Sequence, residues 1–175
     1  MLAGAPISLD PPVLISEFVA DNDLSLLTRT RTLPTDNFID PPEAPDWVEL
    51  TNISGQRIDV GGMHLTDDAD APQKWQIPAD TLIDIGQQLV IFASGNDIRD
   101  PKLDELGYLH TDFRLQGSGE YLALTDHDGV VVHEFTPGYP PQRPDVAFGI
   151  TMDRRELIGP SAPLDYLIPT DDSLS

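Results

Sequence analysis

The chain has 175 residues and carries thirty acidic against ten basic side chains, a formal net charge of −20. A field of that sign repels phosphate groups, so we expect neither nucleic acid nor anionic membranes as partners. The absence of cysteine excludes disulfides, thiolate metal sites and cysteine nucleophiles, while 17 prolines indicate long connections around the core of one domain.

Residues 1–12 combine glycine and proline without a hydrophobic period, which predicts an N-terminal linker. They have neither a basic region nor a sustained apolar region, so we expect no signal peptide in this stretch. Because the last residues also read as ordinary polar sequence, we expect the chain to be a fragment of a longer exported protein.

Short apolar runs with period two, separated by Gly, Asn and Asp, predict an all-β domain. The predicted strands are 13–20, 46–52, 57–65, 75–77, 88–93, 108–115, 120–125 and 130–135. Asp128 and Gly129, between the last two runs, predict a hairpin with a type I′ turn, in which both central residues need positive φ.

The long segment 21–45 has no clear periodicity, and a loop of that length is uncommon in a compact domain. Residues 23–27 are compatible with a short helical turn, with Asp21 or Asn22 as its cap. The simpler interpretation of the rest is that apolar residues fix the loop to the edge of the domain, namely Leu26, Leu27 and Phe38. The alternative is a partner-binding loop.

Strand 46–52 indicates which side chains face the interior. Val48 and Leu50 alternate with Trp47 and Glu49, and the face of Val48 and Leu50 is the better candidate for the core. The predicted core residues are Val48, Leu50, Leu65, Ile77, Leu89, Ile91, Leu122, Leu124 and Val132.

The order of several runs resembles a known family. WVELTN, GGMHLTDD, KWQIP, LVIFASG and GEYLALTDHDG are similar to the lamin tail domain as it occurs in bacterial proteins. The resemblance covers residues 13–135 and implies an immunoglobulin-like antiparallel β-sandwich. Residues 136–175 are then a proline-rich C-terminal extension, or a linker to a further domain. Their apolar islands at 146–150 and 166–168 either dock on this domain or belong to the next one.

The sequence contains no motif of a catalytic site. The run from Gly117 to Gly119 lacks the frame of a nucleophile elbow, and the chain has neither a phosphate loop nor a dinucleotide fingerprint. We therefore predict that the protein is not an enzyme. The four histidines are expected to be outward or hydrogen-bonded side chains: His64, His110 and His133 on strands and His127 in a turn.

Two other residue pairs have both a structural and a chemical interpretation. Glu17 and Glu49 lie on strands that pair in the lamin tail topology, and solvated carboxylates are a better interpretation than a glycosidase pair, which needs a cleft. Trp47 and Trp75 offer faces for stacking on sugars, although one aromatic residue on each of two strands more often packs in a core.

The segment from Thr66 to Asp70 is the most specific cluster. Its carboxylates, Asp67, Asp68 and Asp70, suit a hard cation such as Ca²⁺, which takes oxygen ligands from side chains and loop carbonyls. The pattern lacks the spacing, glycine and terminal glutamate of an EF-hand. The alternative is a charged hairpin tip that only solvates the turn, and we expect no other cofactor.

The resemblance implies a non-catalytic interaction module of a larger exported bacterial protein, mediating attachment to a protein or to the cell surface. The alternative is a carbohydrate- or calcium-binding accessory module of an extracellular hydrolase. In either case the expected partner is a protein or a surface polysaccharide, the expected location is extracellular or at the cell surface, and the expected state is a monomer or a weak dimer formed through edge strands.

Overall fold

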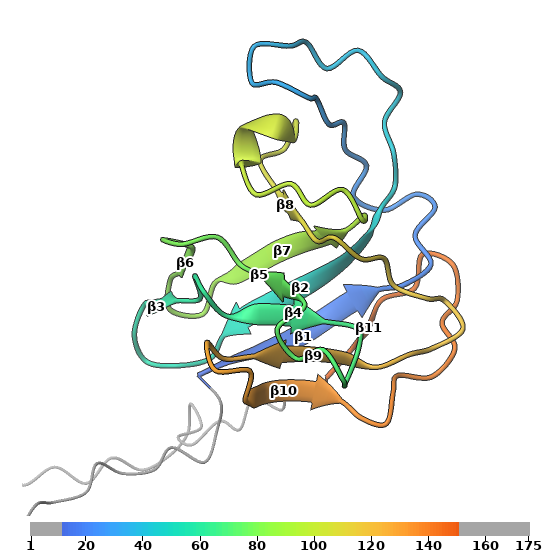
Figure 1. The fold of residues 1–175 in the computed structure, drawn as a ribbon. Coiled ribbons are helices and arrows are strands. Elements are labelled where there is room, and N and C mark those ends of the chain that lie inside the picture. Colours follow the sequence, from blue (N-terminus) through green and yellow to red (C-terminus); the bar gives the residue numbers. More distant parts are fainter. Residues whose placement is uncertain (1–11, 151–175) are drawn as a thin grey trace, which may run out of the picture.

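The structure, a computed structural model, describes residues 12–150 and contains eleven strands and one short 3₁₀-helix in that range (Figure 1). No helix among those residues is long and apolar enough to cross a membrane. The elements are β1 (Val13–Val19), β2 (Asp46–Asn52), β3 (Ile58–Asp59), β4 (His64–Thr66), β5 (Trp75–Gln76), β6 (Leu82–Ile83), β7 (Gln88–Ala93), η1 (Pro101–Leu103), β8 (Leu109–His110), β9 (Leu122–Thr125), β10 (Val131–Phe135) and β11 (Phe148–Gly149).

Two sheets pack face to face, as an immunoglobulin-like sandwich requires. The first has the strand order β11-β1-β2-β7-β8, and the second has the order β10-β9-β4-β5. All neighbours are antiparallel except β7 and β8, which run parallel. A small ribbon of β3 and β6 lies to one side (Figure 1). The prediction of an all-β antiparallel sandwich is confirmed.

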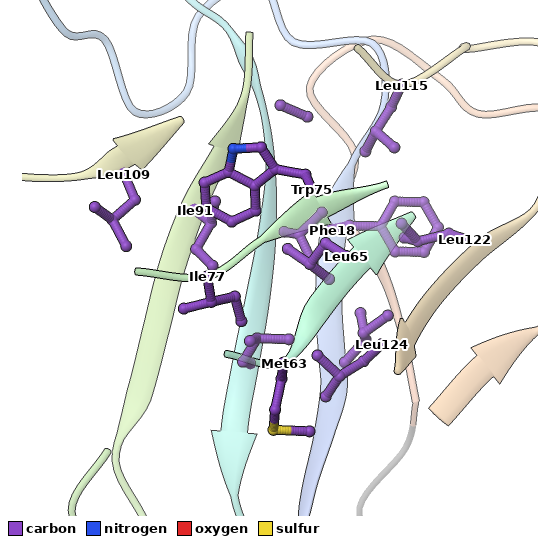
Figure 2. Packing of buried hydrophobic residues seen from close by; sticks show 14 of the residues in the cluster. Phe18, Met63, Leu65, Trp75, Ile77, Ile91, Leu109, Leu115, Leu122 and Leu124 are labelled. Atoms are coloured by element: carbon purple, nitrogen blue, oxygen red, sulfur yellow. The ribbon is translucent and has the colours of Figure 1, made fainter. Parts of the chain in front are cut away.

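The core lies between the sheets, as the period-two pattern predicted. The predicted residues that are fully buried there are Val48, Leu50, Leu65, Ile77, Ile91, Leu122 and Leu124. Leu89 and Val132 are only partly buried and pack against this cluster. Trp75 and Phe18 are its largest fully buried side chains, and Figure 2 shows them in the layer between the sheets. Burial of this apolar layer stabilises the sandwich.

The opposite face of the first sheet is also covered. Val19, Trp47 and Phe92 form a second buried cluster, against which Tyr108 packs. The rings of Phe92 and Tyr108 meet edge to face with centroids 5.2 Å apart. The central strands therefore bury both faces, which explains why β1 and β7 have apolar residues at successive positions.

Three local predictions were wrong. The predicted strand 57–65 is two strands, β3 and β4, because Gly62 turns the chain with φ 87°. The predicted strand 108–115 is reduced to the two residues of β8. The turn between β9 and β10 is not type I′, because only Gly129 has positive φ (82°). Asp126 determines this turn through its carboxylate, which accepts the N–H groups of Asp128 and Val130 at 2.9 and 2.8 Å.

The segment after β10 remains part of the domain. Phe148 pairs with Phe18 across β11 and β1, and their ring centroids are 5.5 Å apart. Tyr139 is buried in the core cluster. The boundary predicted at Phe135 is therefore too early, and the apolar island at 146–150 docks on this domain. The island at 166–168 and all but the last residue of the predicted N-terminal linker, residues 1–12, lie outside the described residues.

Candidate functional site

Residues 28–43, which we call the arm, project from one end of the sandwich between β1 and β2 (Figure 1). The base of the arm is closed by two backbone hydrogen bonds. The N–H of Thr28 donates to the carbonyl of Glu43 at 2.9 Å, and the N–H of Glu43 donates back at 2.8 Å. These bonds bring together two segments that are fifteen residues apart in sequence and give the arm a defined exit from the domain.

The first half of the arm is attached along its length to the segment around η1. The N–H of Arg31 donates to the carbonyl of Leu103, and the N–H of Glu105 donates to the carbonyl of Arg29, each at 2.9 Å. The Arg29 guanidinium also pairs with the Glu105 carboxylate at 2.7 Å. The arm therefore has a fixed support rather than only a hinge at its base.

Arg31 organises the outer part of the arm. Its guanidinium donates to the carbonyls of Lys102 and Asp36 at 2.7 and 2.8 Å and lies over the Phe38 ring, 4.4 Å from its centroid. The Asp36 carboxylate accepts the N–H of Leu33 at 2.9 Å, which closes a turn at the tip. The shape of the arm is therefore determined by internal contacts before any partner binds.

A buried hydrogen-bond network anchors the root of the arm. Asp104 Oδ2 accepts the hydroxyl of Thr28 at 2.5 Å and contacts His110 Nε2 at 3.1 Å, while His110 Nδ1 contacts Ser94 Oγ at 2.9 Å. Burial alone would raise the pKa of the Asp104 carboxyl, but hydrogen bonds from His110, Thr28 and two backbone N–H groups outweigh it and lower that pKa. The carboxylate therefore stays ionised inside the domain.

The same network contains the three groups of a serine hydrolase triad, Ser94, His110 and Asp104. Ser94 is only 4% exposed and His110 is fully buried. Thr28 of the arm also covers Asp104, whose other carboxylate oxygen accepts two backbone N–H groups. A nucleophile needs access for its substrate, so we interpret this network as an anchor. The prediction that His110 is a hydrogen-bonded strand residue agrees with its position.

The apolar residues of segment 21–45 do not attach it to the domain. The predicted anchors Leu26 and Leu27 are exposed, and Phe38 packs under Arg31 within the arm. The predicted helical turn at 23–27 is absent, because Asp145 Oδ1 accepts the N–H groups that begin this stretch and Leu26 has φ 47°. The prediction of apolar anchoring was wrong, because polar groups anchor the segment instead.

The tip of the arm exposes large apolar side chains. Ile39 is 83% exposed and Leu33 is 56% exposed, and Leu24 lies exposed near the base. Between the arm and segment 96–103 lies an open cleft of about 740 Å³, which is within the ~300–1,000 Å³ range of ligand sites. Its polar lining includes Thr32, Thr35, Asn37, Asp40, Asn96 and Asp97.

A second cleft, of about 400 Å³, lies at the root of the arm and is lined by Asp21, Glu43, Asp46 and Arg114. Burial raises the pKa of the Asp46 carboxyl to about 6, with a further increase from the neighbouring charge of Asp21. The N–H of Asn22, which donates to this carboxylate at 3.0 Å, opposes that change. This cleft lies where the arm joins the start of β2.

The three carboxylates predicted to bind Ca²⁺ lie in the loop between β4 and β5. Asp67 pairs with Lys74 at 2.6 Å, and Asp68 Oδ1 accepts the N–H of Asp70 at 2.9 Å. Thr66 closes the loop from inside, with its hydroxyl donating to carbonyls of the loop. No group of three His, Cys, Asp or Glu side chains within residues 12–150 is arranged to hold a metal ion. The Asp67–Lys74 pair competes with a cation for this loop, and a Ca²⁺ titration tests the calcium hypothesis.

The remaining predicted residues have structural roles. Glu17 lies opposite Glu49 on β1 and β2, and Glu49 Oε1 accepts the hydroxyl of Ser16 at 2.6 Å. Both tryptophans are buried, and the indole N–H of Trp75 donates to Asp97 at 2.9 Å. The indole N–H of Trp47 donates to the Ser25 hydroxyl at 3.2 Å. Neither indole presents a face on which a sugar could stack.

The other histidines hold turns or pack on the second sheet. His64 Nδ1 contacts the carbonyl of Asp126 at 3.2 Å, and His127 Nε2 contacts the carbonyl of Gly61 at 3.1 Å. Burial lowers the pKa of the His133 imidazole, whose ring meets Phe135 edge to face. The sequence singled out segment 21–45, which contains the arm, as a possible partner-binding loop. It did not identify the cleft or the buried network, because their residues are far apart in the chain.

Comparison with known families gives a match to the model described as Lamin Tail Domain over residues 8–138. The matched range includes β1 to β10 and the whole arm, and it ends before β11. No match is found among curated proteins.

Proposed function

The chain belongs to the lamin tail domain family, an immunoglobulin-like family without enzymatic activity, and we propose that it is an interaction module that binds a protein partner through the arm. The observation that carries this proposal is the exposure of Leu33 and Ile39 on a segment whose shape is already determined. Loops of this length in a compact domain are usually functional, and binding residues concentrate on loops held by a rigid scaffold.

The internal contacts of the arm matter for affinity. Ordering a flexible loop on binding costs conformational entropy, and a segment that is ordered beforehand avoids much of that cost. The Arg31 contacts and the backbone bonds to the η1 segment provide this order. The exposed apolar tip can then contribute burial of Ile39 and Leu33 against a partner surface.

We propose that this module belongs to a larger exported bacterial protein and acts in attachment outside the cell or at its surface. The similarity to lamin tail domains of bacterial proteins supports this location. Fractionation of the producing cells with an antibody against the domain tests it. Recovery in the surface or secreted fraction is expected, and recovery in the cytosol alone would contradict it.

The arm is tested with a random-peptide display library and, in parallel, a glycan array. We expect the 175-residue chain to select peptides whose binding is lost in the double variant Leu33→Ser with Ile39→Ser. The matched control is Leu82→Ser with Ile85→Ser, two exposed apolar residues of the β6 region, away from the arm (Figure 1). Equal loss in both variants, or selection of glycans instead of peptides, would refute a protein-binding arm.

A further inference from the structure

We propose that the cleft between the arm and segment 96–103 binds an extended, positively charged peptide segment of the partner, with a Lys or Arg side chain placed next to Asp40. This inference rests on the proposed function and adds the chemistry of the partner. Its first support is the position of the cleft. One wall is the arm itself and the other is the segment to which the arm is bonded, so both walls keep a fixed separation.

The second support is the set of polar side chains that folding leaves unused in this cleft. Thr32, Thr35, Asn37, Asp40 and Asn96 make no side-chain hydrogen bond with any other residue that the structure describes. Some residues of the same types elsewhere close turns, as Asn52 does for Ser54 and Asp126 does for Asp128. An extended peptide presents backbone N–H and C=O groups at regular intervals, and hydroxyl and amide side chains can bond both.

The third support is charge. Three carboxylates line the cleft, Asp36, Asp40 and Asp97, against the single guanidinium of Arg31. Asp36 accepts a backbone N–H and Asp97 is bonded to Arg99 and Trp75, whereas Asp40 has no such bond among residues 12–150. Asp40 also adjoins the exposed Ile39. A peptide that pairs a cationic side chain with Asp40 and an apolar one with Ile39 is complementary to both residues.

The charge of the whole chain favours the same occupant. A chain with a net charge of −20 attracts basic segments over a range of about one Debye length and repels acidic ones. A second copy of this chain carries the same charge and is disfavoured. A polysaccharide is less suited to the cleft, because none of the described residues that line it is aromatic and Phe38 is covered by Arg31.

The experiment uses the strongest peptide from the display library, synthesised and titrated by fluorescence anisotropy. The variants are Asp40→Lys and Asp128→Lys, which change the net charge equally, the second at the turn between β9 and β10, away from the arm (Figure 1). We expect a peptide containing Lys or Arg, weakened about tenfold or more by Asp40→Lys and far less by Asp128→Lys. Its affinity should also fall as salt is added.

The outcomes separate the two proposals. A peptide without basic residues that still depends on Leu33 and Ile39 would overturn the cleft inference and leave the arm as the binding site. Equal weakening by Asp40→Lys and Asp128→Lys would also overturn the cleft inference, because it would reflect only the net charge of the chain. A peptide that is insensitive to both the tip and Asp40 would refute the proposed function, and selection of glycans would replace it with polysaccharide binding.

Discussion

The loop between β4 and β5 and the arm each carry three acidic side chains, but folding leaves them with different capacities to bind a partner. In the first, Asp67 pairs with Lys74 and Asp68 closes its own turn, so two of its three carboxylates are engaged, and that of Asp70 accepts no hydrogen bond from the residues that the structure describes. In the arm, backbone groups and Arg31 maintain the shape, while the side chains of Thr35, Asn37 and Asp40 make no hydrogen bond with any residue in the range 12–150. The comparison teaches that a candidate binding site is identified by the polar groups that folding leaves unused, rather than by the density of charge in the sequence.

The largest expected effect tests whether the arm depends on its buried anchor. Asp104→Leu should leave His110 and Thr28 without their acceptor and lower the free energy of unfolding by about 3–5 kcal/mol. Urea denaturation measures this loss, and trypsin should cleave the folded variant faster at Arg29 and Arg31. The exposed control Asp128→Leu should change stability by about 0.5 kcal/mol or less. Equal effects of the two variants would mean that the network does not anchor the arm.

Core substitutions separate the sandwich from the arm. Leu50→Ala or Ile91→Ala should lower the free energy of unfolding by about 2–5 kcal/mol, because each leaves a cavity between the sheets. Ile39→Ser on the arm should cost about 0.5 kcal/mol or less, since this side chain is exposed. Melting temperatures report both changes. If the two core variants melt like the parent, the assignment of the buried face is wrong.

The pH dependence compares the two carboxylates at the root of the arm. Asp46 binds its proton more tightly in the folded state, with a pKa of about 6, so its effect on stability becomes unfavourable as pH rises from about 4 to 6. Asp46→Asn should remove this slope and raise the free energy of unfolding at pH 7. A pKa difference of about two units between the folded and unfolded states corresponds to about 3 kcal/mol of stability. Partial solvation of the Asp46 side chain makes the gain in the free energy of unfolding smaller than that.

Ionisation of the Asp104 carboxyl changes the stability of the fold in the opposite direction. Its pKa is lowered in the folded state, so its contribution is present above the unfolded value near 4 and is lost as pH falls below it. Urea denaturation between pH 3 and 7, with and without Asp46→Asn, measures both effects. If Asp46→Asn leaves the change of the free energy of unfolding between pH 4 and 6 as it is in the parent, another group causes that change.

The smallest expected effect concerns calcium and directly tests the comparison of the two loops. Ca²⁺ would have to displace Lys74 from Asp67, so we expect millimolar Ca²⁺ at low ionic strength to leave the melting temperature nearly unchanged. A rise that Asp68→Asn with Asp70→Asn abolishes would show that this loop binds the ion after all. Mg²⁺, which releases its water reluctantly, is the control cation.

The local pattern of the sequence was sufficient to predict the layers of the fold. Alternation in WVELTN and LVIFASG placed Val48, Leu50 and Ile91 correctly in the core, because a strand with one face towards the opposite sheet must alternate. The same pattern did not predict the turns that are held by hydrogen bonds to side chains. Asp126 accepts two N–H groups and selects a different turn from the one that Asp128 and Gly129 suggested.

The sequence by itself therefore determined the fold class, the family and most of the core, because each depends on neighbouring residues and their period. Only the tertiary structure decided where the arm is anchored and which polar groups remain free. Thr28, Ser94, Asp104 and His110 meet across 82 residues of sequence. No local pattern specifies such a meeting, since it depends on how the strands carry these residues to one end of the sandwich.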